Sequence, residues 1–428
     1  MFTDINRIAI LAKEDPTRKF YSIAHLITEE RLRQAFWNLR KDASAGIDGT
    51  VHAEYAANVE ENIRQLHRRL VGNKYQAQPL RRVYIPKENG KQRPISIPIL
   101  EDKLVQTVAV NILNAIYKQD FFDCSYGFRP GRSPHHALDE VGRVICTRST
   151  SWVLELDIQA YFDSIVRGNL VEMIRRRVTD GSMLRLIGKW ISVGAIDDGK
   201  LIVSETGTGQ GQPISPLLAN VYLHHVLDKW FEDVVKPRLK GEAHVIRYAD
   251  DAILCFQYRE DAEKVLEVLP KRFAVFGLTL HPEKTRLIAL GRFAQGEARK
   301  RGKKPATFDF LGLTHICARS RQGRFTVHVK TIDKRLRRGL KSIADWCKQH
   351  RHDPVSEQQK ALNAKLRGHY QYYGRRTNHA SLRRFYREVC CIWKKWLNRR
   401  ARGNPLTWEK FYEVLRQNPL MTPRIMHA

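Results

Sequence analysis

The stretch His244–Phe256, HVIRYADDAILCF, decides the fold around which the rest of the chain is arranged. Apolar residues lead into it and out of it, a pattern that predicts two buried strands joined by a tight turn. The turn carries two neighbouring aspartates, Asp250 and Asp251. Two carboxylates held about 4 Å apart repel each other, and one resists ionising unless a cation lies between them. Such oxygen ligands suit Mg²⁺, although a solvated hairpin tip is the simpler explanation of an isolated Asp-Asp pair.

A second carboxylate site favours the metal-binding interpretation. The segment Trp152–Ile158, WVLELDI, alternates in the manner of a strand and carries Asp157 near its end. A two-metal phosphoryl-transfer site needs such a third carboxylate, because one ion activates the attacking oxygen and the other stabilises the leaving group. From the residues alone, the sequence predicts a Mg²⁺-dependent phosphoryl-transfer enzyme with Asp157, Asp250 and Asp251 in its catalytic site.

Charge and composition indicate the class of partner. The 428 residues include 74 Lys and Arg against 45 Asp and Glu, a formal net charge of +29. From Gly291 to the end, 33 basic minus 9 acidic residues leave a surplus of 24, so most of the excess lies in the last third. Such clustering predicts a polyanion partner, because each neutralised phosphate releases counterions.

The same composition bears on the compartment. The chain has no run of about 18 apolar residues and its start, MFTDINRIAILAKEDPTRKF, has no secretory leader, so we expect no membrane association. The 7 cysteines are scattered and form no CxxC pair, which fits a reducing compartment. We expect a cytoplasmic protein, located in a bacterial-type cytosol or nucleoid.

Tyr248-Ala249-Asp250-Asp251, with Asp157 upstream, resembles the palm of a reverse transcriptase. Neighbouring blocks, from roughly Ala45 to Arg400, are similar to those of group II intron-encoded reverse transcriptases and maturases. The resemblance implies an RNA-directed DNA polymerase with two Mg²⁺ ions that also folds its host intron for splicing. Its partners would be intron RNA as template and splicing substrate, a DNA primer or target, and dNTPs. The sequence shows no C-terminal DNA endonuclease of that family, so we do not expect target cleavage by this protein.

The resemblance assigns cations to the nucleotide site. Tyr84–Pro98, YIPKENGKQRPISIP, predicts a hairpin around Asn89-Gly90, and Lys87 and Arg93 flank its turn. By themselves the two cations would be surface charges. In reverse-transcriptase fingers the matching pair contacts the phosphates of the incoming nucleotide, Arg bidentately and Lys as a point charge.

Further nucleotide-site residues follow from the same resemblance. Phe162 would block a ribose 2′-OH and so select dNTPs, the alternative being an ordinary core aromatic, and the carbonyl of Ile158 would touch a metal ion. Gln210, in the QGxxxSP-like block TGTGQGQPISP, would lie near the nucleotide and template. Lys284, in an LxxEKT-like segment, would protonate the leaving pyrophosphate, the alternative being a surface lysine.

The segment Ala361–Trp396 mixes Arg and Lys with Tyr, Phe and Trp. Aromatic rings stack on bases and cations hold phosphates, so this mixture suits RNA. Tyrosines at helical spacing are usually core residues. The segment LRGHYQYYG, however, resembles the maturase-specific domain, which implies that these tyrosines contact RNA. The residues predicted to bind RNA are Arg367, Tyr370, Tyr373, Arg375, Arg376, Arg383 and Arg384.

The expected architecture is an α+β right-hand polymerase fold: fingers and a palm with an antiparallel sheet, then a helical thumb and a helical C-terminal maturase-type domain. The expected divisions are 1–83, an N-terminal helical extension with a template-contacting insertion; 84–325, fingers and palm; 326–400, helical thumb and maturase RNA-binding region; and 401–428, a C-terminal tail. Two alternatives remain open: a splicing-only RNA-binding maturase with a vestigial polymerase site, and a reverse transcriptase repurposed for defence or repair.

Overall fold

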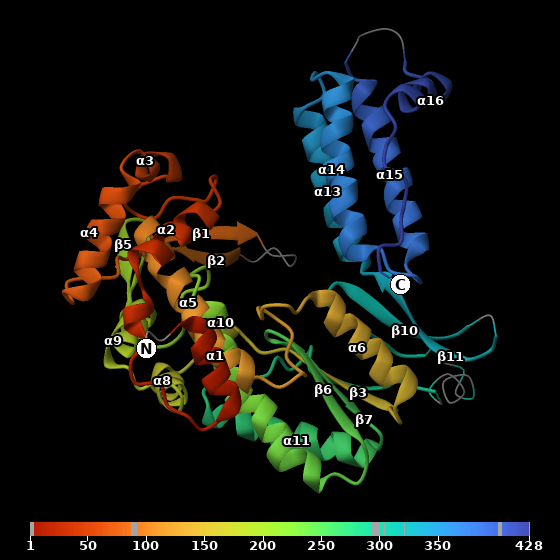
Figure 1. Ribbon diagram of the computed structural model, residues 1–428. Helices are drawn as coiled ribbons and strands as arrows, with labels where there is room; N and C mark the ends of the chain where they lie inside the picture. Colours follow the sequence, from red (N-terminus) through yellow and green to blue (C-terminus); the bar gives the residue numbers. More distant parts are fainter. Residues whose placement is uncertain are drawn as a thin grey trace. The chain divides into compact units, whose positions relative to one another are not determined.

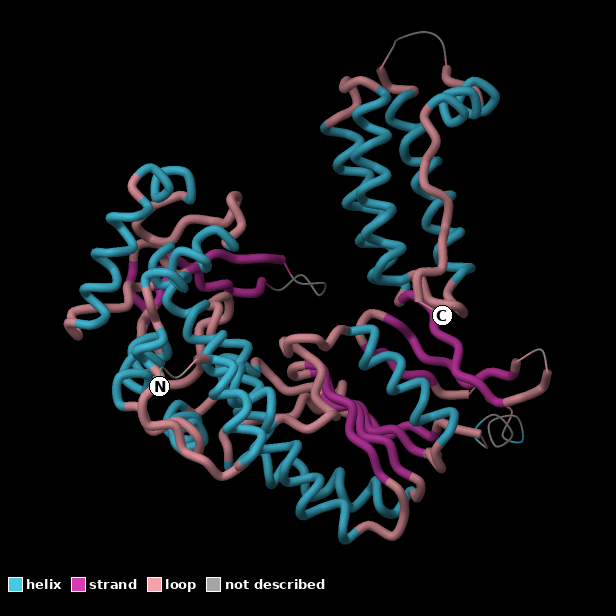
Figure 2. The backbone as a smooth tube through the Cα atoms, viewed as in Figure 1, coloured by secondary structure: helices cyan, strands magenta, loops and turns pink. Residues whose placement is uncertain are grey.

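The computed structural model describes residues 4–427 apart from 87–91, 293, 295–299, 301, 303–304, 321 and 401–404. The chain folds as two units (Figure 1). Unit 1 comprises Met1–Glu140 and Trp152–Leu287, and unit 2 comprises Val141–Ser151 and Ile288–Ala428. Helices and antiparallel strands occur in both units, so the predicted mixture of α and β structure is confirmed (Figure 2).

Unit 1 begins with short helices. They are α1 (Ile5–Glu14), the 3₁₀ turn Ala24–Leu26, α2 (Glu29–Asn38), α3 (His52–Ala57) and α4 (Val59–Val71). The sequence explains where α2 starts, because the Thr28 side chain accepts a hydrogen bond from the Arg31 backbone N–H. Glu29 and Glu30 fill the first turn, where negative charge interacts favourably with the helix dipole.

The first sheet of unit 1 has the order β2-β1-β4-β5. Its strands are β1 (Leu80–Pro86), β2 (Gln92–Ile97), β4 (Ala195–Asp197) and β5 (Lys200–Ile202). Strands β1 and β2 are antiparallel, with Pro86 opposite Gln92, so the predicted pair of extended segments is confirmed. The turn that joins them lies outside the described residues.

The second sheet of unit 1 has the order β6-β7-β3-β8. Its strands are β3 (Trp152–Leu156), β6 (Ala243–Tyr248), β7 (Asp251–Phe256) and β8 (Arg286–Ala289), which crosses the boundary at residue 287. Strand β7 lies between β6 and β3 and is antiparallel to both. It is buried from Ala252 onward, which explains its unbroken apolar run, since a strand covered on both faces needs no alternation. Helix α11 (Arg259–Val275) packs against β3 and β7.

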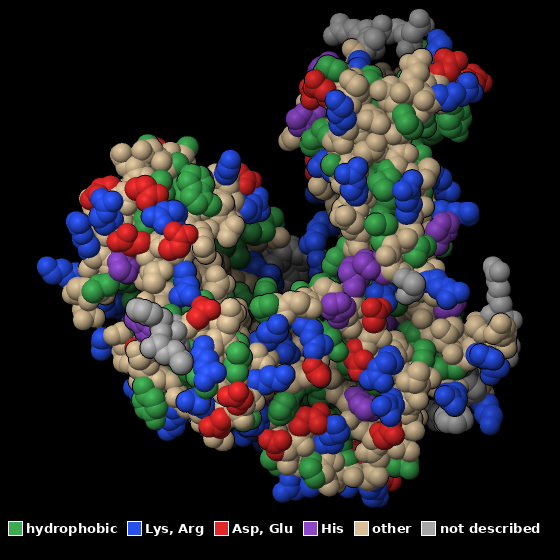
Figure 3. Space-filling model, viewed as in Figure 1, with side chains coloured by type: hydrophobic (Ala, Val, Ile, Leu, Met, Phe, Trp, Pro, Cys, Tyr) green, Lys and Arg blue, Asp and Glu red, His purple; other side chains and the backbone are tan. Residues whose placement is uncertain are grey.

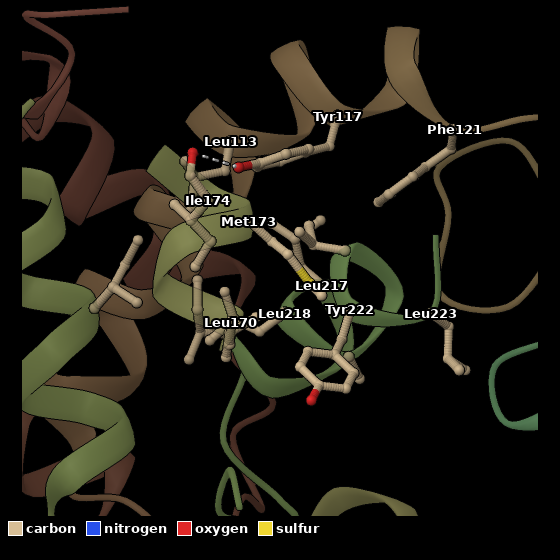
Figure 4. Packing of buried hydrophobic residues seen from close by; sticks show 14 of the residues in the cluster. Leu113, Tyr117, Phe121, Leu170, Met173, Ile174, Leu217, Leu218, Tyr222 and Leu223 are labelled. Carbon is tan, nitrogen blue, oxygen red and sulfur yellow. Dashed lines mark hydrogen bonds between the residues drawn. The ribbon is translucent and has the colours of Figure 1, made fainter. Parts of the chain in front are cut away.

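Further helices lie between the strands of these two sheets in the chain. They are α5 (Leu100–Asp120), α6 (Pro134–Thr147), which crosses the boundary at residue 140, α7 (Tyr161–Ser164), α8 (Arg167–Arg175), α9 (Gly181–Ser192) and α10 (Ser215–Leu223). The π-helical turns His224–Asp228 and Phe231–Val235 and the 3₁₀ turn Lys236–Arg238 follow α10. Side chains of α5, α8 and α10, among them Tyr117, Met173 and Leu217, gather in one buried cluster (Figure 4).

Unit 2 combines a small sheet with a group of helices. The antiparallel sheet has the order β11-β10-β9, formed by β9 (Thr307–Phe310), β10 (Leu313–Arg319) and β11 (Phe325–Thr331). The helices are α13 (Asp333–Gln349), α14 (Val355–Tyr373), α15 (His379–Leu397) and α16 (Trp408–Gln417). Helix α16 lies in the segment expected to be a tail, and its Phe411 is fully buried in the core of these helices. In the described part of the chain, no helix is both long and apolar enough to cross a membrane.

Candidate active site

The acidic turn joins β6 to β7 through two residues, because Tyr248 and Asp251 still pair across the strands. Ala249 has a left-handed backbone with φ of 57°, which residues other than glycine rarely adopt. Asp250 is half-buried and Asp251 is exposed. The predicted pair of buried strands with a tight acidic turn is confirmed.

Asp157 reaches the same end of the sheet from β3. The last residue of β3, Leu156, pairs with Ala252 of β7. Extending this antiparallel register by one residue sets Asp157 opposite Asp251, and opposite residues project to the same face of a sheet. The pairing of β3 with β7 therefore gathers Asp157, Asp250 and Asp251 at one sheet end, although Asp157 lies far from the other two in sequence.

The charges at this sheet end interact. Burial raises the pKa of Asp250 and the negative charge of Asp157 raises it further, while its own backbone N–H and the positive charges of Arg93 and Arg247 oppose the shift. A carboxylate that resists ionisation beside a second carboxylate gains most from a bound cation, because the cation removes their repulsion. The donors are hard carboxylate oxygens, which fit a divalent ion such as Mg²⁺.

Lys284 lies beside Asp157. Its Nζ is 2.8 Å from Asp157 Oδ2, with the lysine side chain 59% exposed and the aspartate 30%. The backbone around Asp157 is also fixed, because its carbonyl accepts a hydrogen bond from the His281 N–H at 2.8 Å. Ile158, whose carbonyl is predicted to touch a metal, is buried and forms an isolated bridge with Leu280.

The carboxylates do not by themselves form a complete metal cage. Among the residues that the structure describes, no group of three or more His, Cys, Asp or Glu side chains is arranged to hold a metal ion. One oxygen of Asp157 is engaged by Lys284 in this conformation. Mg²⁺ is usually bound by one or two carboxylates together with water and substrate phosphates, so protein ligands alone need not complete the coordination.

Of the two cations predicted for the fingers, Arg93 lies among the described residues. Arg93 is exposed on β2, opposite Ile85 of β1. Its positive charge opposes the rise in the pKa of Asp250 that burial causes. Lys87 lies outside the described residues.

Backbone hydrogen bonds fix the positions of Phe162 and Gln210. The carbonyl of Phe162 accepts from Thr208 N at 2.8 Å, and that of Gln210 accepts from Ser96 N at 2.7 Å. A Cβ at the next residue, Gly211, would lie 2.6 Å from the Ser96 carbonyl oxygen, so the loop can approach β2 this closely only through glycine. Phe162 itself is half-buried and packs partly against the core of unit 1.

Arg247 has no place in the sequence prediction. It is fully buried in β6, and its guanidinium donates to the Ala249 carbonyl at 2.9 Å. Its charge is balanced by Asp228, which accepts from Nε at 2.8 Å and from Nη2 at 2.5 Å. An arginine within an otherwise apolar strand is the signal that could have found it, because a buried charge requires a partner.

The residues predicted to bind RNA lie on α14, α15 and the turn between them in unit 2. Those with exposed side chains are Arg367, Arg376, Arg383 and Arg384, while Tyr373 and Arg375 are half-buried. Tyr370 is fully buried, and its hydroxyl donates to the Met421 carbonyl at 3.1 Å. Tyr370 is thus a core residue and does not present its ring to a base. Figure 3 shows Lys and Arg side chains along the visible face of these helices.

The chain is similar to known proteins. The family model described as reverse transcriptase (RNA-dependent DNA polymerase) matches residues 85–315. Protein YkfC of Escherichia coli (strain K12) is 32% identical over 374 residues, which cover 78% of this chain and 93% of YkfC. The group II intron-encoded protein LtrA of Lactococcus lactis subsp. cremoris is 31% identical over 271 residues, 61% of this chain and 45% of LtrA.

The name of a further relative also refers to an intron. The uncharacterized 91 kDa protein in the cob intron of Schizosaccharomyces pombe is 40% identical over 158 residues, 36% of this chain and 19% of that protein. The chain thus spans less than half the length of these two intron proteins. Because the family model covers more than half of the chain and YkfC matches over nearly its whole length, the chain belongs to the reverse transcriptase family of RNA-dependent DNA polymerases.

Proposed function

We propose that this reverse transcriptase extends a DNA primer on an RNA template by two-metal nucleotidyl transfer, and that it also assists the splicing of a group II intron RNA. The observation that carries the proposal is the β3–β7 register, which sets Asp157 opposite the turn that bears Asp250 and Asp251. The three carboxylates, with the carbonyl of Ile158, would hold two Mg²⁺ ions.

The reaction makes a bond from the primer 3′-oxygen to the α-phosphorus of a dNTP and breaks the bond from that phosphorus to pyrophosphate, while the proton of the 3′-hydroxyl passes to water. When bound, the ions would lower the pKa of the attacking hydroxyl and neutralise the charge that develops on the leaving group. Arg93 and Lys87 would hold the triphosphate, and Gln210 would lie beside the nucleotide. Lys284, released from Asp157, would supply the proton that the pyrophosphate takes up.

Within this proposal, the first sheet of unit 1 belongs to the fingers and the second sheet to the palm. Helix α13 would be the thumb, and α14, α15 and α16 would be the maturase-type region that binds intron RNA. The basic surplus supports this division, because α15 alone carries five Lys or Arg residues, namely Arg383, Arg384, Arg387, Lys394 and Lys395, against one acidic residue, Glu388.

Primer extension by the wild type tests the function. An RNA template with an annealed DNA primer should be extended with dNTPs in MgCl₂ and not in excess EDTA. The same preparation should shorten the splicing time of its cognate intron RNA. A folded wild type that promotes splicing but incorporates no dNTP would instead support the splicing-only alternative.

Shortening Phe162 should weaken sugar selection. In Phe162→Val, we expect rNTP incorporation relative to dNTP incorporation to rise by about tenfold or more, because the ring that would exclude the 2′-OH is lost. Competition between a dNTP and its rNTP on one template measures the ratio. If Phe162 is only a core aromatic, incorporation of both nucleotides will fall together and the ratio will not change.

Removing the lysine charge beside Asp157 should lower both the Mg²⁺ requirement and kcat. In Lys284→Gln we expect half-maximal activity at a Mg²⁺ concentration about two- to fivefold lower, because the lysine no longer competes with the metal ion for Asp157. The size of this change corresponds to the free energy of an exposed ion pair. We also expect kcat to fall by about 100-fold, because the leaving group loses its proton donor. Arg286→Gln is the matched control, since Arg286 forms a neighbouring ion pair with Glu155. A higher Mg²⁺ requirement in Lys284→Gln would contradict this role.

A further inference from the structure

The acidic turn has a backbone conformation that needs support. Only two residues connect β6 to β7, and Ala249 is left-handed although it is not glycine. Such residues persist only where the surrounding structure fixes them. Because Ala249 directly precedes Asp250 and Asp251, whatever fixes Ala249 also fixes the two carboxylates.

The guanidinium of Arg247 supplies one such support. Its Nη1 donates to the Ala249 carbonyl at 2.9 Å. The other donors are used within the core: two to Asp228 at 2.8 and 2.5 Å, one to Asn220 Oδ1 at 3.0 Å, and one to Ser125 Oγ at 2.9 Å. All five N–H donors of the guanidinium therefore have acceptors. Four of these hydrogen bonds fix the guanidinium, so that the fifth can hold the Ala249 carbonyl.

The acceptors come from separate parts of unit 1. Asn220 lies on α10, Asp228 ends the π-helical turn that follows α10, and Ser125 lies in the loop before α6. Although burial opposes ionisation of Asp228, Arg247 and the neighbouring His224 keep its pKa below the usual value. The network is therefore a fully paired buried ion pair that links three core segments to one carbonyl of the acidic turn.

A second contact supports the turn from the loop side. A Cβ on Gly127 would lie 2.3 Å from the backbone nitrogen of Ala249, so the loop and the turn are in direct backbone contact. Asn220 joins the two supports, because its Nδ2 donates to the Gly127 carbonyl at 2.7 Å while its Oδ1 accepts from Arg247. The loop also pairs with β6, since Tyr126 N donates to the Arg247 carbonyl at 2.8 Å.

We propose that Arg247 is a positioning residue of the polymerase site. It holds the acidic turn through its hydrogen bond to the Ala249 carbonyl, and the backbone of Gly127 contacts the turn from the loop side. Asp250 and Asp251 thereby keep the orientation that nucleotidyl transfer needs. The inference rests on the proposed function of these carboxylates. It explains why an arginine and its counter-ion are buried beneath the turn, where a pair of apolar side chains would fill the core at lower desolvation cost.

The test compares two buried arginines. Arg247→Lys keeps the positive charge near Asp228 but offers at most three donors and cannot form the fork. Arg177→Lys is the matched control, because Arg177 is 5% exposed and pairs with Asp120 at 3.0 Å in the same unit without contacting the turn. We expect Arg247→Lys to lower kcat by about 100-fold, because a displacement of the catalytic carboxylates by about 1 Å has an effect of that size. The KM for dNTP should be nearly unchanged. Arg177→Lys should keep the wild-type kcat.

A second readout does not depend on activity. In the metal-free protein, amide hydrogen exchange in the segment 248–252 should be faster in Arg247→Lys than in the wild type and unchanged in Arg177→Lys. Exchange that stays at the wild-type rate in Arg247→Lys would overturn the proposal, and so would equal losses of kcat and of melting temperature in the two variants. If the wild type makes no DNA, the proposed function fails, and the exchange measurement still decides whether Arg247 holds the turn.

A backbone variant covers the case in which Arg247→Lys does not fold. Gly127→Ala removes none of the acceptors of Arg247 but pushes a methyl group against Ala249. It should reproduce the loss of kcat and the faster exchange at 248–252. Gly168→Ala is its control, because a Cβ at Gly168 on α8 meets no atom within 4 Å. Wild-type kcat in a folded Gly127→Ala would contradict the role given to the turn's position.

Discussion

Asp250→Asn should abolish DNA synthesis and at the same time stabilise the metal-free protein. Synthesis is lost because asparagine cannot supply the negative oxygen that a divalent ion requires. Stability rises because burial and the charge of Asp157 hold the pKa of Asp250 above its usual value in the folded state. The ionised carboxylate therefore costs folding free energy at neutral pH, and the neutral amide removes that cost.

The sign of the pH dependence follows from the same shift. When Asp250 is protonated in both states, at a pH below its unfolded pKa of 3.8, it imposes no cost. As pH rises through that value and then through the higher folded pKa, the unfolded chain releases its proton first and the folded protein loses stability. The melting-temperature advantage of Asp250→Asn should accordingly be absent at low pH and fully present above the folded pKa.

Thermal unfolding in EDTA and in MgCl₂, with primer extension on the same samples, measures both effects. The wild type should gain more melting temperature from Mg²⁺ than Asp250→Asn, because an ion that binds only the folded state stabilises it. Asp163→Asn is the control, since this exposed carboxylate on α7 is not among the proposed ligands. DNA synthesis by Asp250→Asn would refute the ligand assignment, and an unchanged melting temperature in EDTA would refute the electrostatic explanation.

Local patterns were sufficient to predict the elements that carry the site. Apolar residues on both sides of Asp250 and Asp251 predicted the hairpin. The meeting of Asp157 with the turn required one further assumption, that β3 pairs with β7. The resemblance to a known palm implied that the three carboxylates share one site, but it did not specify the strand pairing that brings them together.

Contacts between distant residues could not be predicted in this way. Nothing local to Arg247 shows that Asp228 lies against it, because the partner is brought there by the path of the chain after α10. The ion pair of Lys284 with Asp157 is equally non-local. For Tyr370, helical spacing allowed both a core and a surface position, and only the packing of the segment after α16, which supplies the Met421 carbonyl, decides between them.

Charge reversal at two exposed arginines of α15 should separate RNA binding from polymerisation. In Arg383→Glu/Arg384→Glu, we expect the affinity for intron RNA to fall by at least about tenfold at moderate salt. The reason is that two phosphate contacts are replaced by repulsion. Nucleotide addition at saturating primer-template should persist, because Asp157, Asp250 and Asp251 lie in unit 1 and are not altered.

The salt dependence of binding distinguishes lost phosphate contacts from a misfolded surface. Each lost contact should reduce the slope of log affinity against log salt by about 0.7 to 0.9, so the double variant should lose roughly 1.4 to 1.8 units of slope. Lys264→Glu/Lys271→Glu on α11 makes the same change in net charge and is the control. If both variants lose RNA affinity equally, binding depends on overall charge and not on α15. If Arg383→Glu/Arg384→Glu alone loses RNA affinity and splicing while it still extends primers, the two activities reside on different surfaces of one chain.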